Sequence, residues 1–122
     1  MSDAALIVRW GPTQPGRERN AIELFAESLR YFSSLVADGK VDSVEPFFVE
    51  PHSSDLEGFW IVRGDVEKLA LLRVSDDFAR LAVRAQAVVY AFGVIGATTG
   101  ERLNKHMAWF AEAAQQAEDS KG

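Results

Sequence analysis

The chain has 122 residues, a length that favours one domain with its own hydrophobic core, and we expect residues 1–122 to form it with an ordered part from Ala5 to Ala117. Thirteen Lys and Arg against eighteen Asp and Glu give a net charge of −5, which argues against nucleic acid or an anionic membrane as the main partner. The absence of cysteine excludes disulfide scaffolds, zinc ribbons and thiol nucleophiles. With no signal peptide and no apolar run of roughly 18–20 residues, the sequence predicts a cytoplasmic protein.

The first half of the chain predicts a strand, a helix and two further strands. Ala5 to Trp10 is rich in β-branched and aromatic residues, and it is followed by an amphipathic helical pattern that ends near Gly39. Val41 to Val49 has strand character but contains Pro46, which cannot donate to a sheet ladder. We therefore expect that strand at a sheet edge.

The next strand, Gly58 to Arg63, alternates between two faces, with Trp60 on the face opposite to Phe59. Two short helical segments follow, and we expect Asp65 and Ser75 to cap them. Together they predict one helical layer that is broken in the middle.

The last third predicts one more strand and one more helix. Val88 to Ile95 is the most apolar segment and is predicted as a strand covered on both faces. Thr98 and Glu101 have the spacing of a capping box. The helix expected after them has an apolar stripe that comprises Leu103, Met107, Phe110, Ala114 and Ala117.

This order of elements predicts an α+β, ferredoxin-like fold, βαββαβ, with a broken second helix, an extra C-terminal helix and a four-stranded antiparallel sheet. Helices on one face would leave the other face bare and apolar, and a soluble monomer rarely exposes such a surface. The residues expected to line that face are Tyr90 and Phe92, with Trp60 or Phe59 and Ile7 or Trp10.

A local pattern accompanies this order and comprises Gly64-Asp65, Leu69, Leu72, Ser75-Asp76-Asp77-Phe78, Arg84-Ala85, Gly93-Val94-Ile95-Gly96 and Gly100-Glu101. With the element order, it resembles uncharacterised bacterial members of the dimeric α+β barrel superfamily. That resemblance implies a homodimer in which two ferredoxin-like subunits pack their open sheet faces together. The superfamily includes cofactor-free monooxygenases, haem-handling enzymes and muconolactone-isomerase-like proteins, so the fold alone selects no activity.

The candidate ligand-binding residues are aromatic side chains and two arginines, namely Arg9, Trp10, Trp60, Arg63, Tyr90 and Phe92. If the first and third strands are a central parallel pair, both arginines lie near the same end of the sheet. A guanidinium at the mouth of an apolar barrel can bind a carboxylate or phosphate, although a structural role explains the same residues.

No other motif indicates catalysis. His52 is expected in a solvated loop, and His106 on the last helix, with no cluster of metal ligands around either. No glycine pattern matches a dinucleotide or phosphate loop, and the third strand lacks the RNA-recognition signature. We therefore expect no metal, no cofactor, no nucleic acid and no membrane partner.

Two hypotheses of function remain open. The first is a protein that binds a small apolar or aromatic molecule in the barrel, with cofactor-independent oxygenase or isomerase-like chemistry. The second is a structural or regulatory dimerisation module with neither ligand nor catalysis. A cavity of roughly 300 Å³ or more with a converging polar group favours the first. Under either hypothesis, replacing Tyr90 or Phe92 with Asp is predicted to break the dimer.

Overall fold

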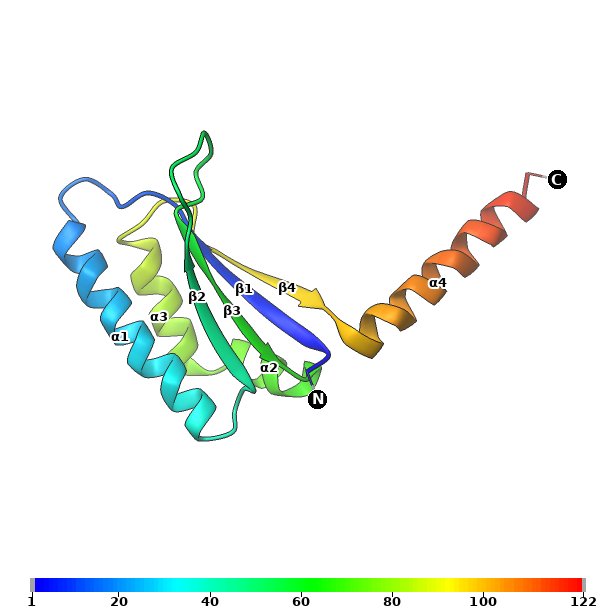
Figure 1. The fold of residues 1–122 in the computed structure, drawn as a ribbon, viewed down its shortest axis with the longest axis horizontal. Helices are drawn as coiled ribbons and strands as arrows, with labels where there is room; N and C mark the ends of the chain where they lie inside the picture. The colour runs from blue at the N-terminus through cyan, green and yellow to red at the C-terminus, as the bar shows by residue number, and fades with distance from the viewer. Residues whose placement is uncertain (1, 122) are drawn as a thin grey trace.

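The computed structural model describes residues 2–121 and shows one four-stranded sheet with helices on a single face (Figure 1). The elements are β1 (Ala4–Trp10), α1 (Glu18–Ala37), β2 (Ser43–Phe48), β3 (Gly58–Gly64), α2 (Val66–Arg73), α3 (Asp76–Gln86), β4 (Gly93–Thr98) and α4 (Gly100–Asp119). The sheet is antiparallel throughout, in the order β2-β3-β1-β4. The predicted ferredoxin-like α+β fold is confirmed.

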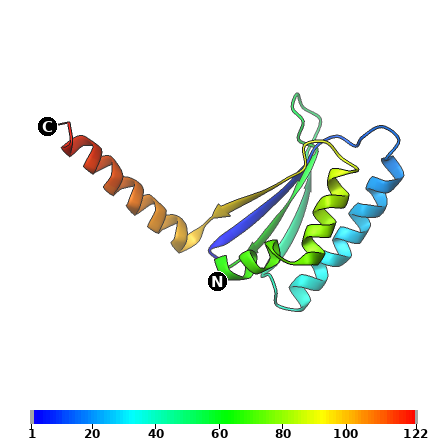
Figure 2. The same cartoon turned by 180° about the vertical axis from the view of Figure 1, so that it is seen from behind.

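The core lies between the sheet and the helix layer, which Figures 1 and 2 show from opposite sides. Alternate residues of the two central strands point into it, among them Val8 of β1 and Val62 of β3. Phe32 of α1 packs against them and is 1% exposed. Strand alternation and an amphipathic helix thus meet in one core.

The helix layer is broken where the sequence predicted a break. The carboxylate of Asp65 accepts a hydrogen bond from the backbone N–H of Lys68 at 2.8 Å and caps α2. The hydroxyl of Ser75 accepts one from the N–H of Phe78 at 3.4 Å and caps α3. These caps satisfy backbone donors that a helix start otherwise leaves unpaired, so two short helices replace one long one.

Pro46 lies in β2, and β2 is an edge strand, as expected. The turn before it contains Gly39 at a φ of +71°, which a glycine adopts without steric cost and which ends α1. Both local predictions are confirmed.

The strand predicted from Val88 to Ile95 exists, but its bounds are wrong, because β4 begins only at Gly93 and continues to Thr98. The chain turns at Ala91, whose φ is +52°. Before that turn the backbone is held by the loop after β1, with the N–H of Tyr90 donating to the carbonyl of Pro12 at 2.9 Å. The apolar character of this segment reflects packing of Val88 against the helices instead of pairing in the sheet.

The last helix, α4, extends away from the body of the molecule (Figures 1 and 2). Its N-cap residue is Thr99 instead of the expected Thr98, which ends β4. The Thr99 side chain makes no capping hydrogen bond, so the expected capping box of Thr98 and Glu101 does not form. No residue of α4 is buried. Among residues 2–121, no helix is both long and apolar enough to cross a membrane.

Candidate functional site

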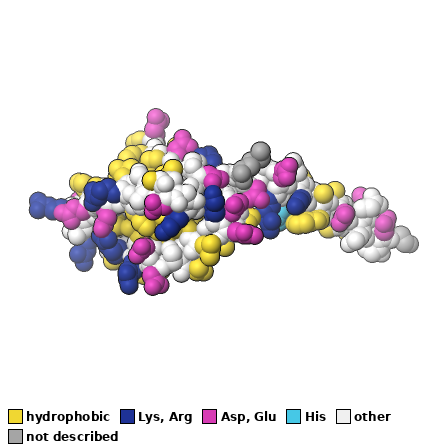
Figure 3. All heavy atoms as spheres, turned by 90° about the horizontal axis from the view of Figure 1, so that it is seen from below, with side chains coloured by type: hydrophobic (Ala, Val, Ile, Leu, Met, Phe, Trp, Pro, Cys, Tyr) yellow, Lys and Arg dark blue, Asp and Glu magenta, His cyan; other side chains and the backbone are white. Residues whose placement is uncertain are grey.

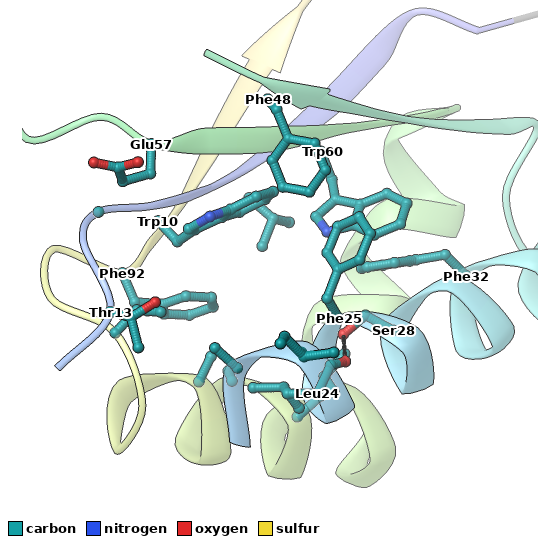
Figure 4. A pocket seen from close by; sticks show the side chains of 18 of the residues that line it. Trp10, Thr13, Leu24, Phe25, Ser28, Phe32, Phe48, Glu57, Trp60 and Phe92 are labelled. Carbon is teal, nitrogen blue, oxygen red and sulfur yellow. Dashed lines mark hydrogen bonds between the residues drawn. The ribbon is translucent and has the colours of Figure 1, made fainter. Parts of the chain in front are cut away.

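A cavity of about 360 Å³ lies between the sheet and helices α1 and α3, and we call it the helix-side cavity (Figure 4). Its floor comes from β1 and β3, its walls from α1 and α3, and one end from the segment before β4. The aromatic residues that line it are Trp10, Phe25, Phe32, Phe48, Trp60, Phe78 and Phe92. Its lining is therefore mainly apolar, as in most small-molecule sites.

The aromatic wall is a connected set of ring contacts. The ring of Phe25 stacks on Trp60 with centroids 5.5 Å apart and lies 5.0 Å from Phe48. Trp10 meets Phe48 edge-on at 6.0 Å. Such offset and edge contacts fix the orientation of each ring, so the wall presents a defined shape to a ligand.

Few polar groups reach this apolar lining. The Ser28 hydroxyl donates to the carbonyl of Leu24 at 2.7 Å, so only its oxygen lone pairs remain for a ligand. The nitrogen of the Trp60 indole faces the open space in Figure 4, and within residues 2–121 its N–H donates no hydrogen bond. The carboxylate of Glu57 is exposed at the rim, beyond Trp10. The Thr13 hydroxyl and the indole nitrogen of Trp10 also belong to the lining. The cavity thus combines a few polar groups on an apolar wall with a carboxylate at the rim.

Three of the six candidate ligand-binding residues, Trp10, Trp60 and Phe92, line the helix-side cavity. They lie under the helices, so the expectation that Phe92 lines the bare sheet face is wrong. Successive residues of a strand point to opposite faces, and Trp10 and Trp60 are on the inward side of their strands. Phe92 lies before β4 begins and so is not part of the sheet. That these side chains touch a ligand stays a prediction.

Arg9 and Arg63 do not meet, because β1 and β3 are antiparallel. Arg9 is opposite Phe59 at one end of the sheet, and Arg63 is opposite Ala5 at the other. The expected parallel pairing is wrong because β2 and β3 form a hairpin, which reverses the chain direction.

Each arginine instead has its own acidic partner. Arg9 donates to a carboxylate oxygen and to the backbone carbonyl of Asp55, at 3.1 and 3.0 Å. Within the described chain, its Nε is the one buried side-chain polar atom with no partner. Arg63 bonds Glu45 at 3.3 Å. Both arginines thus form ion pairs within the protein, as the alternative of a structural role expected.

Tyr90 lies in the loop before β4 and is 52% exposed, so it belongs neither to the sheet nor to the cavity lining. The two histidines also lie elsewhere. His52 is in an exposed loop, bonded to the backbone of Glu50 and the hydroxyl of Ser54, and His106 is exposed on α4. Within residues 2–121 no three His, Asp or Glu side chains gather as a metal site.

The sequence interpretation missed several lining residues, among them Phe25, Ser28, Phe48 and Glu57. One signal was present: Ser28 is a polar residue within the apolar stripe of α1, and the structure shows it buried. Phe25 is part of the same stripe, but periodicity does not distinguish a cavity wall from a filled core.

The opposite side of the sheet carries no helix, and we call it the open face. At its centre Ile7 of β1 is flanked by Ile61 of β3 and Ile95 of β4. Phe47 and Phe59 stack beside them with centroids 4.9 Å apart. The open face comprises Ala5, Ile7, Arg9, Ser43, Glu45, Phe47, Phe59, Ile61, Arg63, Gly93, Ile95 and Ala97. Its charged members are Arg9, which pairs with Asp55, and Arg63 and Glu45, which pair with each other. The central residues between them are apolar.

These features define a ferredoxin-like α+β protein with a cavity on one side of its sheet and an apolar face on the other. Similar solved structures include a dimeric protein of unknown function and ferredoxin-like fold from Bacteroides fragilis, with a TM-score of 0.60 and 5% identity over 79% of this chain and 95% of that one. SnoaB, a cofactor-independent oxygenase from Streptomyces nogalater, matches with a TM-score of 0.53 and 13% identity over 80% and 94% of the two chains. No family model and no curated protein matches the sequence. At these identities the matches show that the chain shares a ferredoxin-like fold with these proteins.

Proposed function

We propose that the protein binds a planar aromatic small molecule in the helix-side cavity, and that the ligand carries a hydrogen-bond acceptor. The observation that carries this proposal is the aromatic wall with an unpartnered Trp60 N–H on its inner side. The indole N–H opens onto the cavity, so an acceptor on a bound ligand can take its hydrogen bond.

The size and composition of the cavity support the same ligand class. Its volume of about 360 Å³ is at the lower end of the range for small-molecule sites, which suits two or three fused rings. Apolar surface dominates the lining, and the only ionisable side chain among the lining residues is Glu57. A neutral aromatic ketone or quinone fits these features better than a charged metabolite.

Cofactor-independent oxygenation is the finer form of this proposal, because the similar structure of SnoaB is described as such an oxygenase. Chemistry of that kind needs a base to withdraw a proton from the substrate. Glu57 is the lining residue that can accept one, and its place at the rim gives it access to the exposed edge of a bound ring. We expect the wild type to consume oxygen with its substrate and Glu57→Gln to consume none. The affinity for the ligand should be the same in both.

The binding proposal is tested with two probes of matched shape, 2-acetonaphthone and 2-isopropenylnaphthalene, and their binding is measured by the quenching of tryptophan fluorescence. One net hydrogen bond predicts about 3- to 10-fold tighter binding of the ketone. In Trp60→Phe, which keeps a ring but lacks the N–H, this preference should disappear.

A second pair of variants tests the location. Ala82 lines the cavity, so Ala82→Phe fills it and should abolish binding of both probes. Ala79 is exposed on the same helix, so Ala79→Phe is the matched control and should bind like the wild type. If neither probe binds the wild type, the proposal is wrong and the dimerisation module becomes the better hypothesis.

We propose further that two copies pack their open faces together as a homodimer. The apolar centre of the open face and the dimeric description of the similar Bacteroides fragilis protein support it. Ile7→Asp places a charge at that centre and should give monomers in sedimentation experiments. Val83→Asp, an exposed apolar residue on α3, is the control and should remain dimeric. Dimers that persist in Ile7→Asp would mean that the interface is elsewhere.

A further inference from the structure

The helix α4 has the sequence of a packed helix, but within the described residues 2–121 none of its residues is buried. Leu103, Met107 and Phe110 form a stripe on one side, and they are 43%, 59% and 70% exposed. The side-chain hydrogen bonds of α4 stay within the helix or its end. Figure 3 shows hydrophobic side chains on the surface of this arm. Helices in proteins owe most of their stability to an apolar face that packs on something, so α4 needs a partner.

The position of α4 indicates where that partner lies. In Figures 1 and 2, helices α1 and α3 are on one side of the sheet and α4 projects on the other, beyond β4. The ribbons of α4 and of the sheet therefore diverge from their junction in the shape of a V, with the open face on its inner side (Figure 1). Its two arms are continuous, because Ile95 and Ala97 of the open face lead directly into the helix.

We infer that α4 packs against a second copy of the chain, so that the helix and the open face form one continuous interface. This inference rests on the homodimer proposed above and adds a second contact surface to it.

The area that a stable dimer needs supports the inference. Four strands spaced about 4.8 Å apart, each about 20 Å long, give the open face a footprint of roughly 400 Å². A stable interface takes about 800 Å² from each partner, so the sheet alone provides about half. A 20-residue helix about 30 Å long and 10 Å wide adds roughly 300 Å². In a two-fold dimer the α4 of each protomer packs on the other protomer, and this added area brings the interface close to what a stable dimer needs.

The experiment compares two double variants of the full chain with the same charge change. Met107→Glu with Phe110→Glu places two carboxylates in the stripe, whereas Ala108→Glu with Gln116→Glu places them on the opposite side of α4. Sedimentation over a dilution series gives the dimer Kd. The stripe variant should raise the Kd at least about 100-fold, and the control should stay within about threefold. Because no residue of α4 is buried in the protomer, both variants should fold as the wild type does.

Hydrogen exchange of the wild type provides a second readout. Backbone amides of residues 103–117 should be protected at concentrations where the dimer is populated and exchange rapidly below its Kd. Exchange of α4 that does not depend on concentration would overturn the inference.

The outcomes separate this inference from the homodimer itself. If Ile7→Asp dissociates the dimer and the stripe variant does not, the homodimer stands and α4 has no part in it. Equal weakening by both double variants also contradicts the inference, since net charge rather than the stripe then decides. A wild type that is monomeric at all concentrations overturns both.

Discussion

Gly58 shows how closely the wall of the helix-side cavity is packed. A Cβ built on this buried glycine would overlap the ring of Trp10 and lie 2.6 Å from the carbonyl oxygen of Phe47. The carbonyl belongs to the paired strand β2 and cannot move without breaking the ladder. Gly58→Ala must therefore displace the Trp10 ring and also strain the β2–β3 ladder at the Phe47 carbonyl. Overpacking of this kind costs about 1–3 kcal/mol.

The matched control is at the other end of the same strand. Gly64 is also buried and inward-facing, but a Cβ there would approach no atom more closely than the Leu69 methyl group, at 3.3 Å. A smaller backbone entropy of the unfolded chain offsets that contact, so Gly64→Ala should change the free energy of unfolding by less than about 0.5 kcal/mol. The two variants differ in what the added methyl group meets.

Thermal unfolding followed by circular dichroism measures this difference. With an unfolding entropy of about 2.1 cal/mol/K per residue over 122 residues, Gly58→Ala should lower the Tm by about 4–12 °C. It should also weaken binding of 2-acetonaphthone, whereas Gly64→Ala should change neither quantity. Equal Tm values for Gly58→Ala and wild type would refute the described packing of Trp10 on Gly58.

Three further predictions follow from particular contacts. Phe32→Ala should cost about 3–5 kcal/mol in urea unfolding, because it empties a fully buried site. The hydrogen bond from Arg84 holds the pKa of the Glu27 carboxylate below its ordinary value. The contribution of this pair to stability is therefore present above about pH 4.5 and is lost as the pH falls through the lowered pKa. Carboxyl NMR titration should show a lower Glu27 pKa in the wild type than in Arg84→Ala. Tyr90→Asp, unlike Ile7→Asp, should leave the dimer intact in sedimentation, because Tyr90 lies in the loop before β4 and not in the sheet.

The parts of the fold that were predictable depend on local chemistry. Asp65 and Ser75 cap helices because their side chains reach the backbone N–H three residues on, wherever the helices lie. Pro46 indicates an edge strand for the same local reason. Period-two alternation also assigned Phe59 and Trp60 to opposite faces correctly.

The parts that were not predictable depend on tertiary packing. Val88 and Phe92 are apolar because α1 and α3 cover them, and an apolar run does not reveal whether a strand or a packed loop carries it. The cavity depends on how far the helix layer stands from the sheet, which Phe25 and Trp60 set through their ring contact. No pattern in the sequence encodes that distance.

Successive side chains of β1 and β3 point to opposite faces of the sheet, so even-numbered and odd-numbered residues form its two surfaces. Even-numbered positions such as Val8 and Trp60 build the cavity side, and odd-numbered positions such as Ile7 and Ile61 build the open face. Substitutions can therefore change one surface while leaving the other untouched, so the two can diverge independently. A one-residue deletion within either strand, by contrast, would exchange the two sets at once, with isoleucines entering the cavity and an indole entering solvent. The protein should tolerate changes of residue type in these strands far better than changes of length.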